Sequence, residues 1–362
     1  MTAFTNPNTK IIYIHIGTQK TGSTTIQKTL SKYSSELLEE GLVYLGKCRK
    51  IASGYNIAKS TNLNSEIVDE LTKYLDKSFK KIKYQDKSRY IISNEKFSGN
   101  KFTGYNNAKI LAETLKAVTN NLEVDAKIIV FIRRQDKYLE STYKERIYRG
   151  ESYTFDDFLN RYKKAEFHWD TFLDTFAEKF GHNNIKVKRY GNEFLPKKHS
   201  LINNFGNSID SEFLKNFNQT LFKNRSYSKD ILEIARISNA VLTNNEIKKI
   251  REILKKVNSQ YPQEEYSLFS NKQRSDYMKR YQKSNSRVAK KYFNIKTGRL
   301  FAPIQESPDI FHKNEPLSLE SVVPVLLKSI LLLQNDMEYQ YQLTRKKSTV
   351  EKIVKKIKSY LN

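Results

Sequence analysis

The sequence has a single cysteine, Cys48, so no disulfide can form within the chain, and one free thiol suits a reducing compartment. The few histidines are scattered without His-x-x-His or Cys-x-x-Cys spacing, so no pattern typical of a metal site is present. The longest apolar run, Val322 to Leu333, is too short to cross a bilayer and contains Pro324 and Lys328. The polar stretch from Met1 to Lys10 is unlike a signal peptide. We therefore expect a cytoplasmic protein without a bound metal.

Acidic residues are scarce relative to basic ones, with 39 Asp and Glu against 64 Lys and Arg, a net charge of +25. Such an excess suits either a nucleic-acid binder or an enzyme that handles anionic ligands. The lysines are spread along the whole chain among many Asn, Ile and Tyr residues, a bias that a low-GC genome produces by itself. No zinc-finger, helix-turn-helix or RNP pattern is present, so we expect no nucleic-acid partner.

The segment from Ile11 to Thr25 joins a β-branched apolar run to a glycine-bounded turn and a helix start. Backbone N–H groups of such a turn, together with the helix dipole, favour a bound phosphate or sulfate. Gly17 and Gly22 have the spacing of the triphosphatase loop G-x-x-x-x-G-K-[ST], but Ser23 stands where its lysine belongs. An ordinary strand–turn–helix with a surface lysine is the alternative. The expected anion-binding residues are Gly17, Thr18, Gln19, Lys20, Thr21, Gly22, Ser23, Thr24 and Thr25.

The lysine of this loop lies inside it, at Lys20, which weakens the case for ATP hydrolysis or phosphoryl transfer. A lysine there suits the bridging oxygen of an anhydride leaving group, with the hydroxyls of Thr21, Ser23, Thr24 and Thr25 in support. The run from Lys20 to Thr24 resembles the K-x-G-[ST]-[ST] loop of sulfotransferases that use 3′-phosphoadenosine 5′-phosphosulfate (PAPS), and residues 14–22 resemble their bacterial branch. The resemblance implies PAPS as donor, 3′-phosphoadenosine 5′-phosphate (PAP) as product, and no required metal.

A second segment, residues 126–149, is a buried-type strand that ends in two arginines and leads into a polar helix. Arg133 and Ser141 lie eight residues apart, and the resemblance implies that they hold the 3′-phosphate. An arginine at the carboxyl end of a parallel strand reaches the crevice where ligands bind, and its guanidinium gives two aligned bonds to a phosphate. For Arg134 a structural or solvent-facing position is as consistent with the sequence as contact with the ligand.

Two further strands end in candidate site residues. Tyr90 to Phe97 begins as a short apolar strand and carries Glu95, which matches the histidine or glutamate that sulfotransferases present as base. A salt bridge to Lys20 or an arginine is the alternative for Glu95, and His15, expected as a hydrogen-bonded core residue, is the alternative base. Tyr190 ends a strand that resembles the family strand whose tyrosine lies against the adenine.

Apolar runs at 11–16, 42–45, 90–93, 128–132 and 185–190 alternate with helical stretches at 23–35, 64–80, 106–120, 136–149 and 155–180. This alternation predicts an α/β fold: a P-loop-type parallel sheet of about five strands flanked by helices, followed by a helical C-terminal extension. We expect a catalytic core over 1–200, a helical basic part of the same unit over 201–302, and the extension over 303–362.

The last part of that extension, 346–362, has an amphipathic pattern with a basic polar face. Packing on its own domain is the favoured interpretation because so short a helix is marginal alone, and peripheral contact with an anionic membrane is the second.

Together with the resemblance, these features predict an enzyme that transfers the sulfuryl group of PAPS to a hydroxyl of a glycan or glycolipid, acidic ones included, in capsule or lipopolysaccharide synthesis. Glu95 would act as base, and Lys20 would stabilise the leaving phosphate. Two alternatives remain: a P-loop kinase of a small molecule or glycan, and a non-catalytic basic binder of nucleic acid or anionic membrane.

Overall fold

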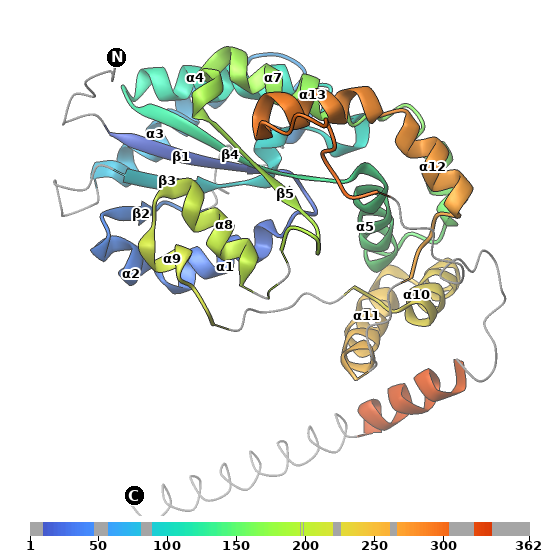
Figure 1. Cartoon of the computed structure of the whole chain (residues 1–362). Coiled ribbons are helices and arrows are strands. Elements are labelled where there is room, and N and C mark those ends of the chain that lie inside the picture. Colours follow the sequence, from blue (N-terminus) through green and yellow to red (C-terminus); the bar gives the residue numbers. More distant parts are fainter. Residues whose placement is uncertain are drawn as a thin grey trace, which may run out of the picture. The chain divides into compact units, whose positions relative to one another are not determined.

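The computed structural model describes residues 10–46, 57–80, 89–195, 197, 199–219, 226–260, 266–303 and 322–334. The chain divides into two compact units (Figure 1). The first comprises residues 1–141, 159–223 and 271–306, and the second comprises residues 142–158, 224–270 and 307–362. The candidate site lies entirely in the first unit.

The first unit contains one five-stranded sheet in the order β2-β3-β1-β4-β5. All four strand pairs are parallel. The predicted parallel α/β fold is therefore confirmed. Because β1 lies between β3 and β4, the winding of the chain reverses direction at β1, and ligands of open parallel sheets bind outside the strands' carboxyl ends at such a point. The strands are β1 (Ile11–Gly17), β2 (Leu42–Tyr44), β3 (Arg89–Ser93), β4 (Asp125–Arg133) and β5 (Ile185–Tyr190).

Helices cover both faces of this sheet (Figure 1). On one face, Tyr13, Ile91 and Phe131 join a core with residues of α1 (Ser23–Lys32), α2 (Ser34–Glu39), α8 (Ser200–Ile209) and α9 (Glu212–Lys215). On the other face, α7 (Trp169–Phe180) packs on β4, and α4 (Ala108–Asn121) lies between α7 and α3 (Ser65–Lys80). Coverage of both faces explains why β1 and β4 are continuous apolar runs rather than alternating ones.

The expected single helix over 155–180 is wrong, because the structure has α6 (Phe155–Arg161) and then α7. Between them, Ala165 and Phe167 are buried while Lys164 and Glu166 are exposed. That alternation has the period of an extended segment, not of a helix. The apolar residues that suggested one long helix therefore fill the core from an extended connection.

The remaining elements of the first unit are α5 (Gln135–Tyr148), which continues into the second unit, α12 (Asn271–Lys279), α13 (Gln282–Phe293) and four short 3₁₀ turns. The turns are η1 (Ile57–Lys59), η2 (Glu95–Ser98), η3 (Lys101–Thr103) and η4 (His182–Asn184).

The second unit contains α10 (Lys229–Val241), α11 (Asn244–Ser259) and a helix over 322–334. Aromatic residues form part of its core: the ring of Phe155 packs edge-on against Phe269 with centroids 4.9 Å apart. Of the helices in the described part of the chain, none combines the length and apolar composition that a membrane crossing requires. The predicted amphipathic segment 346–362 lies outside the described residues.

Candidate active site at the carboxyl ends of the strands

The loop between β1 and α1 is held in shape by its own hydroxyl groups. Thr18 donates to the carbonyl of Phe131 through both its backbone N–H and its Oγ1, each at 3.0 Å. The carbonyl of Thr18 in turn accepts from Thr21 Oγ1 at 2.6 Å and from Ser23 Oγ at 3.3 Å. These three side chains therefore fix the loop against β4 and against itself. Of the other two hydroxyl residues, Thr24 is exposed and Thr25 is half-buried.

Two glycines let this loop form. Gly17 has a φ of +101°, and a Cβ there would lie 3.2 Å from Glu95 Cα. Gly22 has a φ of +83°, and a Cβ there would lie 2.5 Å from Leu201 Cδ2 and 3.2 Å from Tyr190 Cε2. Both positions thus combine a left-handed backbone with a close approach that a side chain would disturb.

The backbone N–H groups at the start of α1 are available to a ligand. Gly22 is the N-cap of α1 and provides no side-chain cap. Among the described residues, the N–H groups from Thr21 to Thr24 donate to no backbone carbonyl, whereas those of Thr25 and Ile26 donate to Gly22. Uncapped N–H groups at a helix start, together with the helix dipole, form an anion site.

Arg133 brings three of the predicted residues together. Its Nη1 donates to the carbonyl of Lys20 at 3.0 Å, and its guanidinium lies 5.3 Å from the centroid of the Tyr190 ring. Arg133 and Tyr190 are register partners at the ends of β4 and β5. The Nε of Arg133 is buried and has no hydrogen-bond partner among the described residues. The carbonyl of Arg133 accepts from Trp169 Nε1 at 3.0 Å, so the fully buried indole fixes the backbone from which this side chain projects.

Glu95 lies in η2, just beyond the end of β3, and is half-buried beside the loop. Its Oε2 accepts a hydrogen bond of 2.9 Å from Gln27 Nε2, and its backbone carbonyl accepts one of 2.8 Å from Gln19 Nε2. The neutral amide of Gln27 therefore orients the carboxylate of Glu95. An oriented carboxylate next to this loop suits a proton acceptor for a bound hydroxyl.

The sequence analysis missed the residues that support Gln19 and Glu95. Tyr105 donates its hydroxyl to Gln19 Oε1 at 2.6 Å, and the hydroxyls of Tyr105 and Tyr138 are 2.7 Å apart. The sequence could have pointed to Gln27, because it is a polar residue next to Ile26 on the buried side of α1. No sequence pattern points to Tyr105, because 86 positions separate it from Gln19.

His15 is a core residue, as expected. A hydrogen bond of 2.7 Å joins its Nδ1 to Ser93 Oγ, and the ring lies edge-on to Phe131 and Phe205. Complete burial lowers the pKa of His15 to about 3. The imidazole is therefore neutral at physiological pH and lies beneath the loop, away from solvent.

Arg134 is a structural residue. It makes two hydrogen bonds to the carboxylate of Asp136, at 2.8 and 2.9 Å, and Arg274 approaches the same carboxylate at 3.0 Å. Ser141 lies half-buried in the second turn of α5, and within the described part of the chain no hydrogen bond connects it to Arg133 or to the loop. Its role toward a 3′-phosphate stays a prediction.

Among the described residues, no three His, Cys, Asp or Glu side chains are arranged to share a metal ion.

No known family profile matches the chain. No curated protein matches it either. Among solved structures, the chain is similar to a sulfotransferase from Alicyclobacillus acidocaldarius, with a TM-score of 0.38 and 12% sequence identity. The similarity covers 68% of this chain and 96% of the other.

Proposed function

We propose that the protein is a PAPS-dependent sulfotransferase that acts on a hydroxyl of a glycan or glycolipid. The observation that carries this proposal is the loop after β1: its N–H groups from Thr21 to Thr24 lie at the uncapped start of α1, and Arg133 and Tyr190 meet beside it. A ligand with one anionic group at the loop and a ring with a second anionic group next to it matches this arrangement.

The residues present fit PAPS. The uncapped N–H groups of α1 suit its 5′-phosphosulfate, and Tyr190 offers a ring face for the adenine. The buried Nε of Arg133 lacks a partner among the described residues, and a buried N–H donor without an acceptor costs stability that an anion restores. Arg133, with Ser141 on the following helix, is the proposed site of the 3′-phosphate. When bound, PAPS supplies an activated sulfuryl group and leaves as PAP.

Glu95 is the proposed base. Its carboxylate, oriented by Gln27, accepts the proton of the acceptor hydroxyl as the new sulfur–oxygen bond forms. Lys20, inside the loop, stabilises the negative charge that develops on the departing phosphate oxygen. His15 is too deeply buried and too weakly basic to replace Glu95.

The competing function is phosphoryl transfer by a P-loop kinase. A kinase loop places lysine where this chain has Ser23, and here the Ser23 hydroxyl donates to the carbonyl of Thr18. This arrangement favours sulfuryl over phosphoryl transfer.

Calorimetry and thermal unfolding with PAP, AMP and ATP·Mg²⁺ test the proposal. We expect PAP to bind more tightly than AMP, because AMP lacks the 3′-phosphate, and to stabilise the protein by about 2.7 kcal/mol at 100 times its dissociation constant. Stabilisation by ATP·Mg²⁺ that exceeds that by PAP would favour the kinase. Indifference to all three nucleotides would favour a non-catalytic binder.

A further inference from the structure

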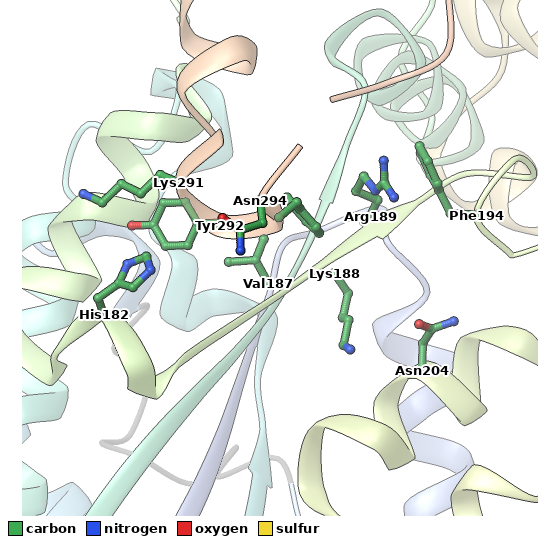
Figure 2. A pocket seen from close by; sticks show the side chains of 10 residues that line it. His182, Val187, Lys188, Arg189, Phe194, Asn204, Lys291, Tyr292 and Asn294 are labelled. Carbon is green, nitrogen blue, oxygen red and sulfur yellow. The ribbon is translucent and has the colours of Figure 1, made fainter. Parts of the chain in front are cut away.

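A second site lies along the free edge of the sheet, where β5 is the last strand. It is a groove of about 910 Å³ between β5, α8 and α13 (Figure 2). In Figure 2 the side chain of Lys188 extends to one side of the strand, toward Asn204 of α8. Arg189 extends to the other side, beside Phe194. The polar and aromatic residues that line the groove include Lys188, Arg189, Phe194, Asn204, Tyr292 and Asn294.

Lys188 is a half-buried cation on β5. Among the described residues no carboxylate forms an ion pair with it, and burial together with the charge of Lys186 lowers the pKa of Lys188. Holding an ammonium group partly away from water costs free energy that nothing in this part of the structure offsets. A bound anion would offset it.

The side chain of Arg189 is held in place for binding an oxyanion. Its guanidinium lies 4.0 Å from the ring centroid of Phe194 and 5.0 Å from that of Phe293. One of its donors, Nη1, is used by the carbonyl of Leu300 at 3.1 Å. Burial lowers the pKa of Arg189, and Glu193 opposes that shift. A guanidinium packed against two rings loses little side-chain entropy when it binds a carboxylate, sulfate or phosphate.

Other charges of the groove are already neutralised. Lys291 forms an ion pair of 2.9 Å with Asp174, which also accepts a hydrogen bond of 2.6 Å from the hydroxyl of Tyr292. Of the two cations that β5 contributes to the groove, Lys188 therefore has no carboxylate partner among the described residues, and Arg189 feels only the charge of Glu193.

The groove adjoins the candidate active site. Side chains alternate along a strand, so Lys188 and Tyr190 lie on the same side of β5, about 7 Å apart along it. The ring of Tyr190 lies close to the loop, because a Cβ at Gly22 would lie 3.2 Å from its Cε2. A chain-like ligand in the groove thus lies within a short distance of the loop.

We propose that this groove binds an acidic stretch of the glycan acceptor, with uronate carboxylates or ester sulfates at Lys188 and Arg189. The inference rests on the proposed function and specifies its substrate class. Amide groups at Asn204 and Asn294 suit sugar hydroxyls, and aromatic faces suit the apolar faces of pyranose rings. Binding a nucleic-acid backbone requires a row of several phosphate contacts, and two cations on one strand favour an oligosaccharide instead.

The test compares Lys188→Met with Lys186→Met in the full-length protein. Lys186 lies on the same strand, is exposed and does not line the groove, so both variants lose one charge but only Lys188→Met removes a cation from the lining. The probes are a hyaluronan hexasaccharide, which carries glucuronates, and neutral maltohexaose, each titrated by calorimetry. We expect tighter binding of the acidic probe, weakened about tenfold or more by Lys188→Met, since a bond to a charged group is worth ~1.5–3 kcal/mol, or ~10–150-fold. Lys186→Met should bind nearly as the parent does.

Thermal unfolding gives the second readout. Because Lys188 is a partly buried, unmatched cation, Lys188→Met should keep or raise the melting temperature while it weakens the acidic probe. A structural role for Lys188 predicts a lower melting temperature instead, with unchanged binding. Equal affinity for the acidic and neutral probes, or equal losses in both variants, would overturn the inference.

Titration with PAP separates this inference from the proposed function. If PAP fails to bind while the acidic probe remains sensitive to Lys188→Met, the donor assignment fails and the groove stands. If Lys188→Met weakens PAP as much as it weakens the acidic probe, the groove belongs to the nucleotide site and the inference fails.

Discussion

The loop after β1 and the groove along β5 use backbone and side chains in opposite ways. In the loop, the hydroxyls of Thr18, Thr21 and Ser23 bond inward, and the N–H groups at the start of α1 are left for a ligand. In the groove, the backbone belongs to the sheet, and the side chains of Lys188 and Arg189 are left for a ligand. A backbone site recognises one small anion in one place, whereas a side-chain site adapts to an extended one.

Glu95→Gln should have the largest effect and should separate the two regions. The amide keeps the shape of the carboxylate but cannot accept the proton, so we expect transfer to fall by ~10²–10⁴-fold while PAP binding is kept. Binding of the hyaluronan hexasaccharide in the groove should also be unchanged. Near-normal transfer by the variant, measured as PAP release with a saturating acceptor, would remove Glu95 from the base role.

Lys20→Met tests the one side chain of the loop that is assigned to chemistry rather than to loop shape. A cation that meets charge developing in the transition state affects turnover more than ground-state affinity, and losing one such group typically costs ~10²–10³-fold. We therefore expect a fall in kcat of that order with a smaller change in the dissociation constant of PAP. An unchanged kcat with weakened PAP binding would make Lys20 a binding residue only.

Arg133→Ala should weaken PAP by roughly 10- to 150-fold, the range for a bond to a charged group. Arg133 also donates to the carbonyl of Lys20, so the variant loosens the loop itself. AMP is the control, because it retains the 5′-phosphate and reports that loosening alone. Equal losses for PAP and AMP in calorimetry would leave the 3′-phosphate without its assigned partner.

His15 beneath the loop should make stability depend on pH. Its folded-state pKa of about 3 lies below the ordinary value of 6.5, so below pH 6.5 the unfolded chain binds a proton that the native state does not. Stability present above pH 6.5 is thus lost as the pH falls toward 3, by about 1.4 kcal/mol per pH unit. Urea unfolding at pH 7, 6 and 5 measures this slope, and His15→Gln, which keeps a polar partner for Ser93 but does not titrate, should reduce it. Identical slopes would mean that other groups dominate.

Gly22→Ala and Gly46→Ala should have the smallest effects, and they form the best-matched pair of variants. Both glycines have a positive φ, +83° and +86°, so alanine costs about 1–2 kcal/mol of backbone strain at either position. Only Gly22 is also crowded, by Leu201 and Tyr190, whereas nothing lies within 4 Å of a Cβ at Gly46. We expect both variants to be destabilised, but only Gly22→Ala to lose PAP affinity. Similar PAP affinities would mean that the backbone of the loop does not form the site.

The sequence alone was sufficient to predict those features of the fold that are formed by consecutive residues. The apolar runs at β1 and β4 identify buried parallel strands, and the Gly17–Gly22 spacing identifies the loop, because each pattern is complete within a few consecutive residues. Arg133 and Tyr190 lie side by side because strands in one parallel sheet bring their carboxyl ends to one edge, and their role toward a ligand stays a prediction.

Features built from distant segments were not predictable in this way. The groove combines β5 with Asn204 and with residues near 292, and no local pattern links them. The orientation of Glu95 depends on Gln27, 68 positions away, and the inward bonds of Thr21 and Ser23 depend on the particular path of the loop. The break between α6 and α7 was missed because a period of two over a few residues is hidden within a longer apolar pattern.

The two hydrogen bonds from Thr18 to the carbonyl of Phe131 also bear on how the chain folds. They tie the loop to a strand 113 positions later, and Asn94 of the intervening segment donates its N–H to the carbonyl of His15. The loop therefore acquires its shape only when β1, β3 and β4 are aligned, and a fragment that ends before β4 contains every loop residue without the site. Because a ligand at the loop binds only this assembled arrangement, it stabilises three strands at once. Protection of β4 amides from hydrogen exchange should then rise together with that of β1 as nucleotide is added, which makes the loop a reporter of cooperative assembly.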